Sequence, residues 1–115
     1  MSKKSDAARL EAILDYIDDI ERIILRHGSV QGALADMEGQ YAILMCIQQI
    51  GETLNKIKSE EYRAVLPIKG AVDFRNVIVH NYDGINLSVA QLTIEQQIPE
   101  LRKTIQNIME HYNDQ

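Results

Sequence analysis

The sequence predicts a single all-α domain. Apolar residues recur at intervals of three and four along most of the 115 residues, which is the spacing of one buried helix face. The β-branched run at 77–79 could form a strand on its own, but no other segment offers it a partner strand. The length suits one domain and not two. We therefore expect a bundle of four main helices and a short one.

The composition is that of a folded domain, with 45% hydrophobic and 25% charged residues, and excludes a wholly disordered chain. No apolar run approaches the roughly 18 residues of a membrane span, so we expect no membrane association. The residues after Met1 are polar and charged, which argues against a secretory signal. Cys46 stands alone and cannot form an internal disulfide. These features predict a cytoplasmic protein.

The first predicted helix covers about residues 5–26. Its apolar stripe consists of Leu10, Ile13, Leu14, Ile17, Ile20 and Ile24. Gly28 is placed to end this helix in the left-handed conformation, and Ser29 is placed to cap the next helix.

The second main helix is best defined over residues 41–57, where a wide apolar stripe indicates a central position. Its beginning is not defined, because Gly32 and Gly39 interrupt the preceding stretch. Gly51 inside this helix costs about 1 kcal/mol relative to alanine. A close approach of another helix would explain that cost, and a merely tolerated glycine is the alternative.

The remaining segments also have helical signals. Ser59-Glu60-Glu61 begins a short helix that ends before Pro67, and residues 69–82 form the next one. Asp83-Gly84 is a turn, and Ser88-Val89-Ala90-Gln91 has the pattern of a capping box. The last helix keeps its spacing to Tyr112, with a kink or restart near Gln97 because of Pro99.

The charge distribution limits the partners of the chain. Twelve basic against 17 acidic residues give a net charge of −5, and no broad basic face of the kind used by non-specific nucleic-acid binders is present. Residues 56–75 differ, with five basic residues against three acidic ones. Any contact with a polyanion is therefore expected at a small site.

Most chemical motifs are missing. The sequence has no glycine-rich phosphate loop and no serine in a nucleophile elbow. His27, His80 and His111 lack ligand spacing to one another or to Cys46, so we expect no metal site and no cofactor. Cys46 lies in an apolar helical stripe and is interpreted as part of the core.

One segment, residues 75–82, carries a chemically useful set of side chains. On a helix, Asn76 and His80 lie one turn apart on one face with Asp73 beside them, while Arg75 is roughly 140° away around the axis. A separate stripe of Phe74, Ile78 and Tyr82 can anchor the helix in the core. The helix is thus expected to be buried on one side and polar on another.

These groups suit a phosphodiester. Arginine binds phosphate bidentately, and histidine accepts and donates protons near neutral pH. A histidine that deprotonates a ribose 2′-OH, beside an arginine on the phosphate, suffices for metal-free RNA cleavage. Cleavage needs both a base and an acid, and a two-fold dimer would bring two such histidines together. The alternative is a chance spacing in which the polar residues only cap a neighbouring helix.

The same residues resemble a known family. Arg75, Asn76, His80 and Tyr82 match the R-N-x3-H-x-Y motif of HepT-type ribonuclease toxins, which are HEPN domains. Ile50-Gly51-Glu52 is similar to the I-G-E of that family's second main helix, and Ile98-Pro99-Glu100-Leu101 is similar to its closing helix. The features span about residues 7–112, so residues 1–115 are interpreted as one HEPN-like domain.

The resemblance implies a function. Such domains are metal-independent endoribonucleases that dimerise and place two motifs in one cleft. They are commonly paired with a nucleotidyltransferase antitoxin of the MNT type, which can modify the motif tyrosine, here Tyr82, with AMP. Arg75 and His80 would be catalytic on an RNA substrate, tRNA or mRNA, and Asn76 would orient it. Glu52 and Asp73 would support these residues without contacting the substrate, although a salt bridge to a neighbouring basic residue explains Glu52 equally well.

Two features depart from the family. Many relatives have a tryptophan before the motif, where this chain has Leu66-Pro67-Ile68 and no tryptophan, and the acidic net charge is unusual for an RNA-binding protein.

Two other functions remain open. The chain could be a non-catalytic module that binds a nucleotide for a nucleotidyltransferase, or a purely structural helical dimer.

Overall fold

Helices make up nearly all of the described structure. The computed structural model describes residues 2–80 and 87–114, without the side chains of residues 2–4, 74, 76–80 and 112–114. The order is α1 (Ser2–His27), α2 (Val30–Ala35), α3 (Met37–Asn55), α4 (Glu60–Val65), α5 (Ile68–His80), α6 (Leu87–Leu92), a π-helical turn η2 (Thr93–Gln97) and α7 (Ile98–Asp114). The all-α prediction is confirmed, with α1, α3, α5 and α7 as the main helices. The described helix through 77–79 excludes the strand alternative for that run.

Local capping signals operate where the sequence places them. Gly28 has φ +85°, in the left-handed region, and ends α1. Ser29 caps α2 by accepting a hydrogen bond from the backbone N–H of Gly32, and Ser59 caps α4 by accepting one from Tyr62. The capping box predicted at Ser88 is wrong in register, because α6 begins at Leu87 and Ser88 lies inside its first turn.

The structure defines the beginning of the central helix, which the sequence left open. α3 starts at Met37, because Asp36 caps it by accepting a hydrogen bond from Gly39 N at 2.8 Å. Gly39 interrupts nothing. A Cβ there would lie 2.4 Å from the carbonyl oxygen of Ala33, so the glycine permits close contact between α2 and α3.

The predicted disturbance of the last helix by Pro99 is confirmed. The five residues before Ile98 form the π-helical turn η2, in which the backbone N–H of Ile98 bonds to the carbonyl of Thr93. Proline has no N–H and its ring crowds the carbonyl four residues earlier, which here is that of Glu95. The wider turn relieves this conflict one residue before the proline.

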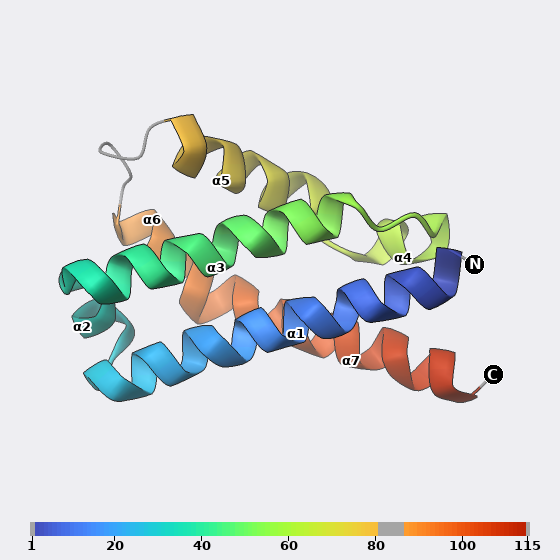
Figure 1. Ribbon diagram of the computed structural model, residues 1–115, viewed down its shortest axis with the longest axis horizontal. Helices are drawn as coiled ribbons and strands as arrows, with labels where there is room; N and C mark the ends of the chain where they lie inside the picture. Colours follow the sequence, from blue (N-terminus) through green and yellow to red (C-terminus); the bar gives the residue numbers. More distant parts are fainter. Residues whose placement is uncertain (1, 81–86, 115) are drawn as a thin grey trace.

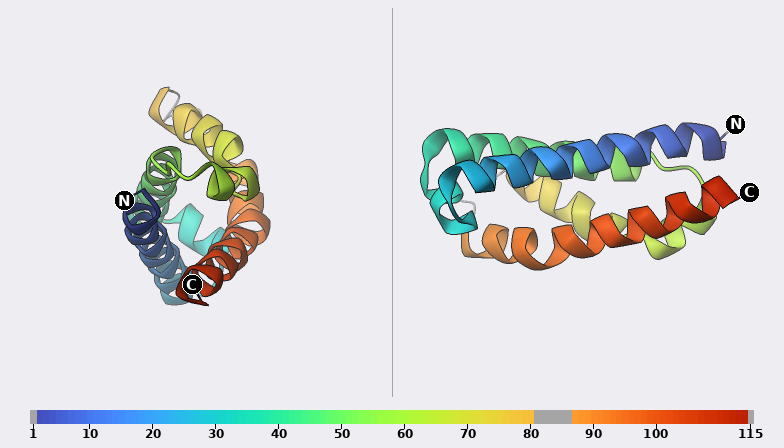
Figure 2. Two further views of the ribbon diagram at one scale, coloured as in Figure 1. Left: turned by 90° about the vertical axis from the view of Figure 1, so that its right-hand side faces the viewer. Right: turned by 90° about the horizontal axis from the view of Figure 1, so that it is seen from below.

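α3 occupies the middle of the bundle (Figure 1). It lies between α1 and α5 and packs against both, while α7 packs against α1. The views in Figure 2 show the helices arranged around one core, with both chain ends at the end of the bundle opposite α2 and α6. The core is almost entirely aliphatic, and its fully buried members include Leu10, Ile13, Ile17, Ile43, Leu44, Leu54 and Ile105.

Two polar contacts join distant parts of the bundle. Asp6 on α1 is completely buried, and its carboxylate accepts hydrogen bonds from the backbone N–H groups of Lys58 at 3.0 Å and Ser59 at 2.8 Å. Arg102 on α7 forms ion pairs with Asp18 and Glu21 on α1. Burial opposes the charge of Arg102, but the two carboxylates outweigh it and raise the pKa of this guanidinium.

Within the described residues, no helix is long and apolar enough to cross a membrane.

Candidate functional site

Residues 75–80 of the polar segment form the end of α5. The backbone of Arg75, Asn76 and His80 is helical, so Asn76 and His80 occupy one face of α5 as expected. The described side chains include that of Arg75 but not those of Asn76 and His80. Tyr82 and the predicted turn at Asp83-Gly84 lie outside the described residues. The part of the candidate site whose side chains are described consists of Arg75 and its surroundings.

Gly51 on α3 determines how closely α5 can lie against α3. A Cβ at this position would be 2.9 Å from the carbonyl oxygen of Ala71 and 3.0 Å from Cβ of Arg75. Both distances are shorter than ordinary van der Waals contact. The explanation of Gly51 by a close helix–helix approach is confirmed, and the residues of α5 that meet it are Ala71 and Arg75.

Arg75 is three-quarters buried at this contact and faces Glu52, the residue after Gly51. Its Nη1 lies 3.5 Å from Oε1 of Glu52, and the two side chains are 23% and 37% exposed. This separation is long for a hydrogen bond, so the attraction is mainly between charges. The predicted association of Glu52 with the motif is thus an ion pair to Arg75 across two helices.

The Nε atom of Arg75 is buried, and no hydrogen-bond partner for it is found among the residues that the structure describes. Most buried polar atoms in proteins are hydrogen-bonded, and an unpaired donor costs about 1–3 kcal/mol. Because Nε is shielded from solvent, an incoming anion would meet the Nη groups of this guanidinium, whose contact with Glu52 is longer than a normal hydrogen bond. Arginine binds phosphate oxygens through two parallel N–H groups, which is the chemistry that such a site offers.

Asp73 lies elsewhere than beside Arg75. It is exposed and forms an ion pair with Lys69 one turn earlier on α5, with 3.0 Å between Lys69 Nζ and Asp73 Oδ2. On the helix it shares the face of Asn76 and His80. The structure therefore brings Glu52 to Arg75, and places Asp73 with Lys69 on the face that leads to His80.

The other candidate side chains have structural surroundings. Cys46 is 9% exposed and free, and burial, followed by the charge of Asp19, raises the pKa of its thiol. This confirms its assignment to the core, because a raised pKa disfavours the reactive thiolate. His111 is exposed near the end of α7.

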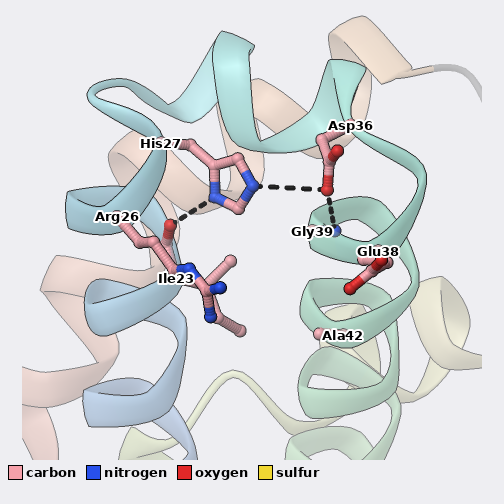
Figure 3. Close-up of a pocket in the computed structure, with 7 residues that line it drawn as sticks. All are labelled: Ile23, Arg26, His27, Asp36, Glu38, Gly39 and Ala42. Carbon is pink, nitrogen blue, oxygen red and sulfur yellow. Dashed lines mark hydrogen bonds and ion pairs between the residues drawn. The ribbon is translucent and has the colours of Figure 1, made fainter.

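Sequence reasoning did not anticipate the surroundings of His27 at the junction of α1 and α3 (Figure 3). His27 lines a pocket of about 340 Å³, with Nδ1 2.8 Å from the carbonyl oxygen of Ile23 and Nε2 3.3 Å from Oδ2 of Asp36. The hydrogen bond from Gly39, followed by that from His27, lowers the pKa of Asp36 despite its desolvation. The spacing of Asp36 and Gly39 is the sequence signal for this N-cap. These contacts hold a helix junction together.

Comparison with known proteins confirms the family that the sequence resembles. The family model described as "Ribonuclease HepT-like" matches residues 13–108. Two proteins of Methanocaldococcus jannaschii, named "Putative RNase MJ1216" and "Putative RNase MJ0125", are each 28% identical over 111 residues, 95% of this chain and 91% and 95% of their own lengths. "Probable ribonuclease HepT" of Thermococcus cleftensis is 28% identical over 102 residues, 87% of this chain and 92% of that protein. No solved structure gives a significant match.

Proposed function

Because the chain belongs to the HepT-like ribonuclease family, we propose that it is a metal-independent endoribonuclease toxin that acts as a homodimer. The observation that carries this proposal is the state of Arg75. Its Cβ packs on Gly51, and its guanidinium faces Glu52 at 3.5 Å, which is too long for a strong hydrogen bond and leaves the Nη groups able to bind an anion. A cation in this state is prepared for an anion such as the phosphate of an RNA backbone.

In the proposed reaction, His80 of one chain removes the proton of a ribose 2′-OH. The oxygen then attacks the adjacent phosphorus and displaces the 5′-oxygen, which takes a proton from His80 of the second chain. Arg75 binds the phosphate and stabilises the extra negative charge of the transition state. Asn76 orients the substrate. The products are a 2′,3′-cyclic phosphate and a free 5′-hydroxyl.

The second chain is part of this proposal for a chemical reason. General acid–base cleavage of RNA uses two proton-transfer groups, and each chain has one histidine in the motif. A two-fold axis near the end of α5 would place two copies of His80 in one cleft.

Regulation by a nucleotidyltransferase antitoxin of the MNT type completes the proposal. An adenylyl group transferred from ATP to the hydroxyl of Tyr82, with release of pyrophosphate, would add bulk and negative charge two residues after His80. It would compete with RNA for Arg75. The intact mass of the modified protein would exceed 13.1 kDa by one or more AMP units, and Tyr82→Phe would abolish the increase.

The test is RNA cleavage in EDTA by the wild type and by His80→Ala, with total tRNA and mRNA as substrates. We expect cleavage by the wild type alone, with 2′,3′-cyclic phosphate ends, and equal helicity and dimer content of both proteins. Cleavage by a pure His80→Ala protein would exclude the mechanism. An unmodified wild type that binds ATP but cuts no RNA would instead identify a nucleotide-binding module.

A further inference from the structure

A recess at the beginning of α5 is separate from the contact between Arg75 and Glu52. It has a volume of about 330 Å³ and opens between the end of α3, α4 and the first turns of α5. Its lining residues are Asn55, Arg63, Ile68, Lys69, Val72 and Asp73. Two of these residues are cations that come from different helices.

Arg63 is held in place by the end of α3. Its Nη1 donates hydrogen bonds to the carbonyl oxygens of Ile57 at 2.7 Å and Asn55 at 3.2 Å. Both bonds use the same nitrogen, so the planar guanidinium keeps other N–H groups for a ligand. A cation that is already fixed loses little conformational entropy when it binds an anion.

Lys69 is the solvent-exposed cation of the recess. Its side chain is 91% exposed, and its Nζ pairs with Asp73, which is 60% exposed. Exposed ion pairs of this kind contribute about 0–1 kcal/mol, so an incoming phosphate can displace the carboxylate at little cost.

The recess lies on the same face of α5 as Asn76 and His80. Positions 69, 73, 76 and 80 are separated by four, three and four residues, so they follow one face of α5. At 1.5 Å per residue, Lys69 lies about 10 Å along the axis from Asn76 and about 16 Å from His80. This separation corresponds to a few nucleotides of extended RNA.

We propose that the recess between Arg63 and Lys69 is an RNA subsite, which binds a backbone phosphate a few nucleotides away from the bond that is cleaved. The inference rests on the proposed function, because the RNA must reach His80 along the same face of α5. Cations that contact phosphates bind RNA of any sequence, so the subsite adds affinity and register rather than base preference. An acidic protein segment is the competing occupant. RNA is favoured because the recess lies on the face of α5 that carries Asn76 and His80, which a continuous strand can follow.

The test compares Lys69→Gln with Lys103→Gln, a matched control at an exposed lysine of α7. Cleavage of an RNA of about ten nucleotides is measured beside cleavage of a dinucleotide, which is too short to reach the recess. We expect Lys69→Gln to raise the KM for the longer RNA about three- to tenfold and to reduce its salt dependence by the share of one phosphate, a slope of about 0.7. The KM for the dinucleotide stays unchanged, and Lys103→Gln changes neither value.

A second substitution, at Asp73, should change the KM for the longer RNA in the opposite direction. Asp73→Asn removes the carboxylate that competes for Lys69 and should lower the KM for the longer RNA. If Lys69→Gln and Lys103→Gln cleave both substrates alike, the subsite is refuted and the proposed function stands. If the wild type cuts no RNA, the proposed function fails, and the subsite with it. Weaker binding of a poly-glutamate peptide by Lys69→Gln, with RNA cleavage unchanged, would assign the recess to a protein partner and refute the RNA subsite.

Discussion

Replacement of Gly51 by alanine tests whether the contact between α3 and α5 controls the site. Helix propensity alone favours the substitution by about 1 kcal/mol. The structure opposes it, because the new Cβ would lie 2.9 Å from the carbonyl oxygen of Ala71, where ordinary contact begins at 3.4 Å. α5 must therefore move by about 0.5 Å. Such overpacking costs about 1–3 kcal/mol.

The expected net effect of Gly51→Ala is a loss of about 1 kcal/mol in the free energy of unfolding, which lowers Tm by about 4 °C. The loss of activity should be larger in proportion. The added methyl group also meets Cβ of Arg75 at 3.0 Å, so the guanidinium shifts with α5. A misplacement of 1 Å can reduce a rate about 100-fold, so a shift of half that size predicts about a tenfold decrease in kcat.

Gly70→Ala is the matched control on α5. A Cβ at Gly70 would have no atom within 4 Å, so only the propensity term remains. We expect this variant to gain up to about 1 kcal/mol and to keep its activity. The assay is thermal and urea unfolding of both variants together with RNA cleavage. If Gly51→Ala is stabilised as much as Gly70→Ala and cleaves RNA at the wild-type rate, the role of the close approach is refuted.

Three further predictions concern side chains around the bundle. Asp6→Ala leaves the backbone N–H groups of Lys58 and Ser59 without their acceptor, so the free energy of unfolding measured in urea should fall by about 2–4 kcal/mol. A decrease below about 0.5 kcal/mol would contradict this role. Because the pKa of Asp36 is lowered, its carboxylate stabilises the fold fully above the ordinary value of 3.8, and this stability is lost as the pH falls through the lower folded value. Asp36→Asn should therefore flatten the decline of stability that the wild type shows in this acid range. An unchanged pH profile would argue against the N-cap. Glu52→Gln removes the negative charge beside Arg75, so RNA should bind several-fold more tightly, while kcat falls because the guanidinium loses its orientation. The free energy of unfolding should change by less than about 1 kcal/mol. If RNA affinity and kcat rise together or fall together, a positioning role is excluded.

The site was predictable in part. The residue types and spacing of Arg75, Asn76 and His80 indicate phosphodiester chemistry from the sequence alone. The link between Glu52 and Arg75 was only a possibility in the sequence, since the residues are 23 positions apart and α4 lies between their helices. The sequence marked residues 56–75 only by their excess of basic residues, whereas the pairing of Arg63 with the last carbonyl of α3 and the recess that it lines with Lys69 are visible only in the structure.

The sequence by itself determined the helices and most of their ends. Their signals are local: a helix face repeats every three or four residues, and a cap at Gly28, Ser29 or Ser59 acts within one turn of the chain. Only the tertiary structure decided which helices meet and how closely. Gly39 and Gly51 weaken a helix when they are considered locally, yet both permit contacts that any Cβ would block. The physical reason is that helix propensity depends on neighbouring residues, whereas the position of Arg75 depends on an atom-to-atom fit between α3 and α5.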